Sequence, residues 1–204
     1  MIRVHSTKAS INGYKVRLLL ALLEVPYELV ELDMYAGEHK REPFLTLNPF
    51  GQMPALTDGA FTIADSHACL VYVARKHDLE GRWLPSDAEG EAKVAEWLSK
   101  SANEVHQGPW MKRAKIRRPD AIKLSDAEID ARCDHILRIM DAHLGKRDWL
   151  ALDRPTIADV SCFGPISMLK VSGYDTDKWP SVTRWLAGVR ALPRAHDIDG
   201  KPFA

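Results

Sequence analysis

Three short segments in the first third of the chain carry side chains that could bind a small charged molecule. Residues 10–16 place the hydroxyl of Ser10 and the amide of Asn12 before an apolar helical pattern. Residues 37–54 contain cations and an amide, and Asp65-Ser66 opens a further helical pattern. A helix N-terminus presents free N–H groups and the positive end of the helix dipole. The position of Ser66 therefore suits the binding of a carboxylate.

Alternating strand and helix patterns must position these segments. Residues 2–5 and 27–32 predict short strands on either side of a helix at 14–24, a β-α-β order with a right-handed crossover. The pair Asp58-Gly59 between two apolar runs predicts a tight hairpin, because Asp-Gly accepts positive φ angles. A helix at 65–76 then closes this half. Beyond residue 87 only helical patterns follow, at 88–113, 125–144, 156–171 and 180–192.

This order of elements predicts two packed domains, one α/β and one all-α. We expect an α/β domain at 1–79, a linker at 80–87 around Pro85-Ser86, and an all-helical domain at 88–204 that carries the second-substrate site. The chain has 204 residues, which is ample for both cores.

Composition excludes several functional classes. Lys and Arg together number 28, as do Asp and Glu, so the net charge of zero favours neither nucleic acid nor anionic membranes as partners. The longest apolar run, at 18–23, is too short to span a bilayer. Three scattered cysteines and the lack of a signal-peptide pattern favour a reducing, cytoplasmic location. The histidines and cysteines form no ligand-spaced motif, so no metal site is expected.

The motifs taken together resemble the glutathione S-transferase family, especially its phi, theta and nu-like branches. The resemblance covers essentially the whole chain. It implies a thioredoxin-like βαβ-ββα domain, a C-terminal helical bundle, and glutathione as co-substrate. The matching segments are Gly37-Glu38-His39-Lys40, Glu42-Pro43-Phe44-Leu45, Asn48-Pro49-Phe50-Gly51-Gln52, Pro54-Ala55, Asp65-Ser66 and Thr156-Ile157-Ala158-Asp159.

The resemblance also implies how glutathione would be held. Ser66 would bind the γ-glutamyl carboxylate, and Asp65 beside it would pair with the α-amine. Pro54 would follow a cis peptide bond, so that the backbone N–H and C=O of Met53 could pair with the cysteinyl part like an added strand. Without the other motifs, Asp65 and Ser66 would be interpreted as plain N-cap residues.

Three residues of the second segment would surround the glycyl carboxylate, namely His39, Lys40 and Gln52. Lys40 offers a positive charge and His39 a hydrogen-bond donor. The alternative for the charged run at 38–42 is a solvated helix face.

The thiol of glutathione must become a thiolate to act as a nucleophile, and a thiol of pKa ~8.5 is mostly protonated at neutral pH. A hydrogen-bond donor held near the sulfur favours the anion. The resemblance implies Ser10 for this role, as in phi- and theta-like members, or Asn12, as in nu-like members, and the sequence does not rank them. Position 10 is not Cys, which argues against an omega-like mixed disulfide. The alternative is that both residues only shape a turn.

A second substrate is expected near Tyr14 and a helix carrying His106, Trp110 and Arg113, although Trp110 alternatively packs in the core. A basic cluster overlaps this helix and is interpreted as a solvated face, with a site for an acidic second substrate as the alternative. Its members are Lys112, Arg113, Lys115, Arg117 and Arg118.

Three functions remain open. The leading hypothesis is a cytosolic glutathione transferase that directs the thiolate at an electrophilic hydrophobic substrate in detoxification. The second is a nu-like glutathione-dependent disulfide reductase or peroxidase, and the third is a binding or interaction module with little turnover. Phe50 occupies the place of an aromatic residue that docks into the partner subunit in many family members, so we expect an isologous homodimer. A hydrophobic anchor within the chain is the alternative role for Phe50.

Overall fold

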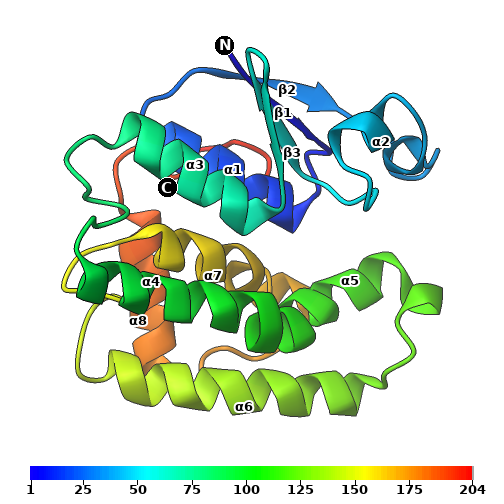
Figure 1. Ribbon diagram of the computed structural model, residues 1–204. Coiled ribbons are helices and arrows are strands. Elements are labelled where there is room, and N and C mark those ends of the chain that lie inside the picture. The colour runs from blue at the N-terminus through cyan, green and yellow to red at the C-terminus, as the bar shows by residue number, and fades with distance from the viewer. Residues whose placement is uncertain (204) are drawn as a thin grey trace. The chain divides into compact units, whose positions relative to one another are not determined.

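The computed structural model describes residues 1–203, which divide into two compact units. Unit 1 comprises Met1–Gly81 together with the segment from Leu192 onward, and unit 2 comprises Arg82–Ala191. All named strands belong to unit 1, and unit 2 is helical (Figure 1). The predicted α/β domain followed by an all-α domain is therefore confirmed.

Unit 1 is built on a four-stranded sheet in the order β2-β1-β3-β4. The central strand β1 pairs in parallel with β2 and antiparallel with β3, and β3 pairs antiparallel with β4. The strands are β1 Ile2–Ser6, β2 Tyr27–Glu31, β3 Ala55–Asp58 and β4 Phe61–Ala64. The helices are α1 Ile11–Leu22, α2 Phe44–Leu47 and α3 Ser66–His77, with a short 3₁₀ turn at Glu38–Lys40.

The core of unit 1 lies between one face of the sheet and the helices α1 and α3, which run side by side (Figure 1). Directly paired strand residues share a face, so Val4 of β1 and Leu56 of β3 both point into this core and are fully buried. Leu19 of α1 and Leu70 of α3 are equally buried. The apolar helical pattern read from the sequence is the face that covers the sheet.

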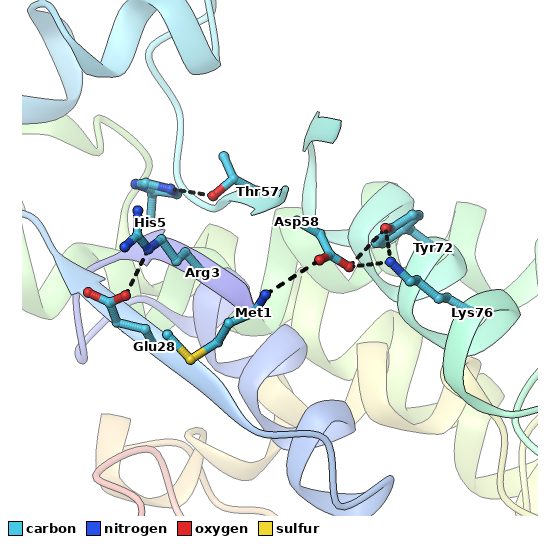
Figure 2. A network of polar contacts seen from close by, with 8 residues as sticks. All are labelled: Met1, Arg3, His5, Glu28, Thr57, Asp58, Tyr72 and Lys76. Atoms are coloured by element: carbon cyan, nitrogen blue, oxygen red, sulfur yellow. Dashed lines mark hydrogen bonds and ion pairs between the residues drawn. The ribbon is translucent and has the colours of Figure 1, made fainter. Parts of the chain in front are cut away.

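The hairpin between β3 and β4 forms as predicted, with its turn shifted by one residue. Asp58 ends β3 and pairs with Phe61, so the two-residue turn is Gly59-Ala60, with Gly59 at φ 61°. The Asp58 carboxylate accepts hydrogen bonds from Tyr72 Oη at 3.1 Å and Lys76 Nζ at 2.5 Å (Figure 2). Asp58 therefore ties the hairpin to α3 rather than adopting a turn conformation itself.

Unit 2 begins with one long helical stretch, α4 Ala88–Lys100, a π-helical segment Ser101–Trp110, and α5 Met111–Arg117. The predicted helix at 88–113 thus lies in one continuous helical stretch, whose hydrogen bonding changes over Ser101–Trp110. That segment contains Pro109, which has no N–H to donate. It packs with α6 Asp126–Leu144 and α7 Ile157–Ser167, and α8 Pro180–Arg190 packs on α6. No helix among residues 1–203 has the length and apolarity to cross a membrane.

Two N-terminal caps begin the helices of unit 2 where the sequence predicts them. Ser125 and Glu128 form a capping box at α6, and Thr156 and Asp159 form one at α7. Asp159 is buried, and its carboxylate also accepts from the Trp185 indole N–H at 3.0 Å. Burial raises the pKa of Asp159, although the hydrogen bonds that it accepts favour the anion. These contacts give the Thr156–Asp159 motif a structural role at the start of α7.

The last segment of the chain does not belong with the helical domain, contrary to the predicted boundary of 88–204. From Leu192 onward the chain packs on unit 1. The Tyr14 hydroxyl donates to the His196 carbonyl, and Arg17 Nη2 donates to the Ile198 carbonyl at 3.0 Å. These bonds join residues about 180 positions apart, and no local sequence pattern reports such pairing.

Candidate functional site

The first candidate residue, Ser10, is the N-cap of α1. Its backbone is extended, with φ −74° and ψ 117°, and its Oγ accepts the backbone N–H of Gly13 at 3.1 Å. Ser10 therefore does shape the start of the helix, as the alternative interpretation proposed. A hydroxyl that accepts one hydrogen bond keeps its own proton to donate. No acceptor for that proton occurs within residues 1–203, so it is available for a ligand.

Asn12 lies in the first turn of α1 and is half-exposed. Its side-chain amide has no hydrogen-bond partner among the described residues. The first-turn N–H groups of α1 and its positive dipole end lie on the same side as Ser10. Ser10, Asn12 and the helix terminus together make this loop favourable for an anion such as a thiolate.

Gly13 allows this loop to approach the sheet, and the sequence analysis did not single it out for this role. A Cβ on Gly13 would lie 2.1 Å from Ser6 Oγ and 2.9 Å from Ser6 Cβ, so only glycine fits without movement. The first turn of α1 thus rests directly on the end of β1. A glycine inside a helical pattern is a signal for such a close contact.

The second segment forms a loop held together by Asn48, another residue whose role the sequence analysis did not assign. Asn48 is buried, its Oδ1 accepts the Phe50 N–H at 3.1 Å, and its Nδ2 donates to the Gln52 carbonyl at 2.6 Å. The oxygen and the nitrogen of one side-chain amide therefore fix the path of residues 48–52. The Asn-Pro pair in the sequence is a turn signal that points to this role.

Met53 and Pro54 follow this loop and lead into β3. The Met53–Pro54 peptide bond is cis, as the resemblance implies, and Glu42–Pro43 is also cis. Within residues 1–203, the N–H and C=O of Met53 have no hydrogen-bond partner. Two unpaired backbone groups just before a strand can pair with an extended peptide.

The backbone of His39 and the side chain of Lys40 lie against Gly51, the residue before Gln52, where the 3₁₀ turn approaches the loop closely. Gly51 has φ 59°, and a Cβ there would lie 2.9 Å from the His39 carbonyl oxygen and 3.2 Å from Lys40 Nζ. Lys40 Nζ also reaches the Phe50 carbonyl at 3.5 Å. Lys40 and Gln52 are exposed and His39 is half-buried. The arrangement offers cationic and amide donors to an anionic group.

The third segment begins α3, with Asp65 as its N-cap. Asp65 Oδ1 accepts the N–H groups of His67 at 2.8 Å and Ala68 at 3.1 Å, whereas Oδ2 has no hydrogen-bond partner in the described chain. Asp65 has φ 77°, a conformation that non-glycine residues rarely adopt and that often occurs at functional sites. Ser66 is buried, and as the first residue of α3 its N–H has no intrahelical acceptor.

Sheet register brings the three segments to one end of the sheet. His5 of β1 pairs with Ala55 of β3, and Ala55 pairs with Ala64 of β4. The Ser10 loop follows β1, Pro54 precedes Ala55, and Asp65 follows Ala64. Ser10, Met53 and Ser66 therefore lie just beyond the ends of neighbouring strands, at the same end of the sheet, although up to 56 positions separate them in the chain.

The face of the sheet that points away from α1 and α3 carries a separate set of polar pairs. His5 Nε2 lies 3.0 Å from Thr57 Oγ1, and Arg3 Nε donates to Glu28 at 2.8 Å (Figure 2). Burial lowers the pKa of His5, and the nearby Arg3 acts in the same direction. These contacts join β1 to its neighbours β2 and β3, and they account for His5 without a catalytic role.

Lys15 is a buried cation near the third segment that sequence reasoning missed. Its side chain reaches from α1 toward the first turn of α3, where Nζ lies 3.5 Å from His67 Nε2. A lysine inside an apolar helical pattern is the signal that could have indicated it.

Of the four residues predicted for a second substrate, Tyr14 is placed elsewhere. It is fully buried in unit 1, where its hydroxyl donates to the His196 carbonyl, so it is a core residue. His106 and Trp110 lie together in the π-helical segment, with stacked rings whose centroids are 4.2 Å apart. Trp110 and Arg113 are half-exposed, so Trp110 is not a core residue.

The basic cluster that overlaps these residues is not a uniformly solvated face, which corrects that interpretation. Lys112 is buried and forms ion pairs with Asp130 at 2.7 Å and Asp126 at 3.3 Å. These carboxylates raise the pKa of Lys112 although its burial acts in the opposite direction. Lys115 donates to the Leu124 carbonyl.

The three cysteines lie in the core. Cys69, Cys133 and Cys162 are all inaccessible to solvent. Burial raises the pKa of Cys69 and of Cys133 to about 12, so these thiols stay protonated at neutral pH. Residues 1–203 contain no group of three or more His, Cys, Asp or Glu side chains positioned for a metal ion.

Comparison with known proteins places this geometry in a family. Residues 2–75 match the family model for the glutathione S-transferase N-terminal domain, and residues 109–188 match the model for the C-terminal domain. The chain is 30% identical to glutathione S-transferase F6 of Arabidopsis thaliana over 206 residues, covering 97% of this chain and 98% of the relative.

Solved structures agree over nearly the whole chain. A glutathione S-transferase from Xanthobacter autotrophicus superimposes with a TM-score of 0.87 at 27% identity, covering 97% of both chains. A glutathione transferase from Phanerochaete chrysosporium, solved with oxidized glutathione, superimposes with a TM-score of 0.83 at 25% identity, covering 94% of this chain and 91% of that one. Together with the three segments at one end of the sheet, these matches establish that the chain belongs to the glutathione S-transferase family.

Proposed function

We propose that this protein is a glutathione transferase in which Ser10 stabilises the thiolate of bound glutathione. The observation that carries the proposal is the free hydroxyl proton of Ser10 at the start of α1, on the same sheet edge as Met53 and Ser66. The relatives named above are glutathione transferases, and this chain matches them over nearly their whole length. This similarity supports the same activity here.

The binding part of the proposal assigns one protein group to each charged or polar part of glutathione. The γ-glutamyl carboxylate accepts hydrogen bonds from the N–H and hydroxyl of Ser66, and Asp65 Oδ2 pairs with the α-amine. The cysteinyl backbone pairs with the N–H and C=O of Met53. The glycyl carboxylate lies near His39, Lys40 and Gln52, and the close approach of Lys40 to Gly51 supports this assignment.

The chemical step uses the thiolate as nucleophile. The Ser10 hydroxyl donates to the sulfur, and the N-terminal dipole of α1 adds to the stabilisation of its negative charge. The thiol proton passes to solvent. The sulfur then forms a bond to the electrophilic carbon, and the leaving group departs with the electron pair of the bond that breaks. Removal of hydrophobic electrophiles in the cytoplasm is the role that this reaction would serve.

The test is a titration of the wild-type protein with glutathione, following the ultraviolet absorbance of the thiolate against pH. A protein that stabilises the thiolate lowers the thiol pKa by about one unit or more from ~8.5, which corresponds to ~1.4 kcal/mol or more. If the bound thiol titrates like free glutathione, the mechanism is wrong. Binding with a lowered pKa but no turnover on a panel of electrophiles would instead support a non-catalytic module.

Asn12 favours a second candidate, a glutathione-dependent disulfide reductase or peroxidase. Its amide lies two residues after Ser10 with no partner in the described chain, so it could contact the sulfur in place of the hydroxyl. Steady-state rates with a model disulfide, a hydroperoxide and an aryl halide separate the two reactions. A preference of about a hundredfold in kcat/KM for the disulfide or the hydroperoxide would favour this candidate.

The proposed assembly is an isologous homodimer anchored by Phe50. The side chain is 81% exposed, although Asn48 holds its backbone firmly in the loop. A large apolar side chain presented from a fixed loop is typical of an anchor for a partner subunit. The high exposure argues against the alternative of an anchor within the chain.

A further inference from the structure

The helical stretch that passes from the π-helical segment into α5 has one side packed inside unit 2. Gly108 lies so close to α6 that a Cβ there would be 3.0 Å from the Arg132 carbonyl carbon. Ser101 Oγ accepts from Ser161 of α7 at 2.7 Å, and the buried Lys112 is paired with Asp130 of α6. Side chains on the other side of the stretch therefore remain accessible.

His106 and Trp110 form a stacked pair of aromatic rings on that accessible side, here called the aromatic platform. Their rings are nearly parallel, with an interplanar angle of 18° and centroids 4.2 Å apart. Both side chains are half-exposed. The guanidinium of Arg118 lies 6.0 Å from the centre of the Trp110 ring. Because the two rings cover each other's inner faces, a further planar ring can stack only on an outer face of the pair.

Arg113 adds positive charge beside the aromatic platform. It follows Trp110 by three residues, which places both on one face of the helix, and it is half-buried. Within residues 1–203, neither Arg113 nor Arg118 has a hydrogen-bond acceptor or a carboxylate partner. Lys115, by contrast, donates to the Leu124 carbonyl. Two guanidinium groups next to the platform thus keep their donors for an external anion.

We infer that this surface of unit 2 binds a planar aromatic carboxylate. The ring of the ligand stacks on the aromatic platform, and its carboxylate accepts charge-assisted hydrogen bonds from the fork of Arg113, with Arg118 adding positive charge. A simple carboxylate lacks the stacking, and a neutral aromatic amide lacks the charge. Use of such a ligand as the second substrate rests on the proposed transferase function, whereas the binding itself does not.

Isothermal titration calorimetry on the full chain tests the inference with naphthoate, the neutral naphthamide and acetate as probes. We expect naphthoate to bind at least about tenfold more tightly than naphthamide, and acetate to give no heat. Arg113→Gln should reduce naphthoate affinity to the level of naphthamide, and Trp110→Ala should weaken both aromatic probes. Arg138→Gln, which removes an exposed arginine of α6, is the matched control and should bind like the wild type.

Equal affinities for naphthoate and naphthamide, or unchanged affinity in Arg113→Gln, would overturn the inference. Circular dichroism checks that each variant is folded, and Arg113→Lys is a second variant that keeps the charge and loses the fork geometry. Its affinity should fall between those of the wild type and Arg113→Gln. The calorimetry is run without glutathione and the thiol titration without naphthoate, so each proposal can fail without the other.

Discussion

The Ser10 hydroxyl oxygen accepts the Gly13 N–H at 3.1 Å, so the residue proposed to activate glutathione also caps the helix that it begins. The two roles use different parts of the hydroxyl group, since the oxygen lone pair caps the helix and the proton is left to donate in the proposed mechanism. The capping bond holds the Ser10 oxygen in place at the start of α1. Such preorganisation favours the thiolate without a further ordering cost.

The dual role of Ser10 predicts two separable losses in Ser10→Ala. The free energy of unfolding should fall by about 1 kcal/mol from loss of the cap. The pKa of bound glutathione should rise by about one unit, because one charge-assisted hydrogen bond is lost. Urea denaturation measures the first and thiolate absorbance the second. Ser10→Thr keeps the hydroxyl and is the control. If the thiol pKa of glutathione bound to Ser10→Ala equals that of the wild type, another group contacts the sulfur, and Asn12 is the first to test.

Two variants of Asp65 should likewise distinguish its role as a helix cap from the role of its charge. Asp65→Asn keeps an Oδ1 that can accept from His67 and Ala68, so stability should change little, whereas glutathione affinity should fall because the charge facing the α-amine is lost. Asp65→Ala should lose about 1 kcal/mol of stability as well. Calorimetry with glutathione and urea denaturation give the two readouts. Asp65→Asn with wild-type affinity would leave Asp65 as a cap alone.

The contact between Gly13 and Ser6 predicts a destabilised Gly13→Ala protein. The new Cβ would lie 2.1 Å from Ser6 Oγ, so the strand and helix must separate, at a cost of about 1–3 kcal/mol. Ser6→Gly removes both of the Ser6 atoms that the Cβ would meet. The double variant Ser6→Gly/Gly13→Ala should therefore lose less free energy of unfolding than the losses of the two single variants added together, as measured by urea denaturation. Simple additivity would show that the clash is relieved elsewhere.

We expect the charge of Asp134 to make a pH-dependent contribution to the stability of unit 2. Its carboxylate accepts from Lys178 Nζ at 2.6 Å and from the Tyr174 hydroxyl, and these bonds lower its pKa below the ordinary 3.8. A lowered pKa in the folded state adds stability above pH 3.8, and this stability is lost as pH falls through the folded pKa.

The corresponding variant is Asp134→Asn, which removes the charge and keeps an oxygen acceptor. Both members of the Asp134–Lys178 pair are nearly half-exposed, so we expect a loss of at most ~1 kcal/mol at pH 7. The difference from wild type should shrink below pH ~4. Denaturant titrations across pH measure it, with the exposed Asp120→Asn as control. A difference that does not vary with pH would exclude the charge as its cause.

The proposed role of Phe50 leads us to predict that the protein is a dimer. Phe50→Ser should shift the protein from dimer to monomer at micromolar concentration, as measured by sedimentation velocity, because the apolar anchor is lost. Leu79→Ser is a matched control, since Leu79 is 91% exposed and is not expected at an interface. A wild-type protein that is monomeric, or a Phe50→Ser protein that remains dimeric, would rule out Phe50 as the anchor.

The sequence by itself determined the elements and the family. Period and turn chemistry placed the strands of unit 1 and the helices of unit 2, because these features depend on residues only a few positions apart. The joint set of motifs indicated the family and the segments that would bind glutathione. Motifs of this kind are local and readable in a single chain.

Only the tertiary structure decided which residues meet and which are hidden. Tyr14 became a core residue through its bond to the His196 carbonyl, and the register of β1, β3 and β4 brought Ser10, Met53 and Ser66 to one edge. The structure also separated the buried, ion-paired Lys112 from its neighbour Arg113, which has no acceptor in the described chain. Burial and partnership depend on side chains from distant elements, and the pattern of one helix does not contain that information.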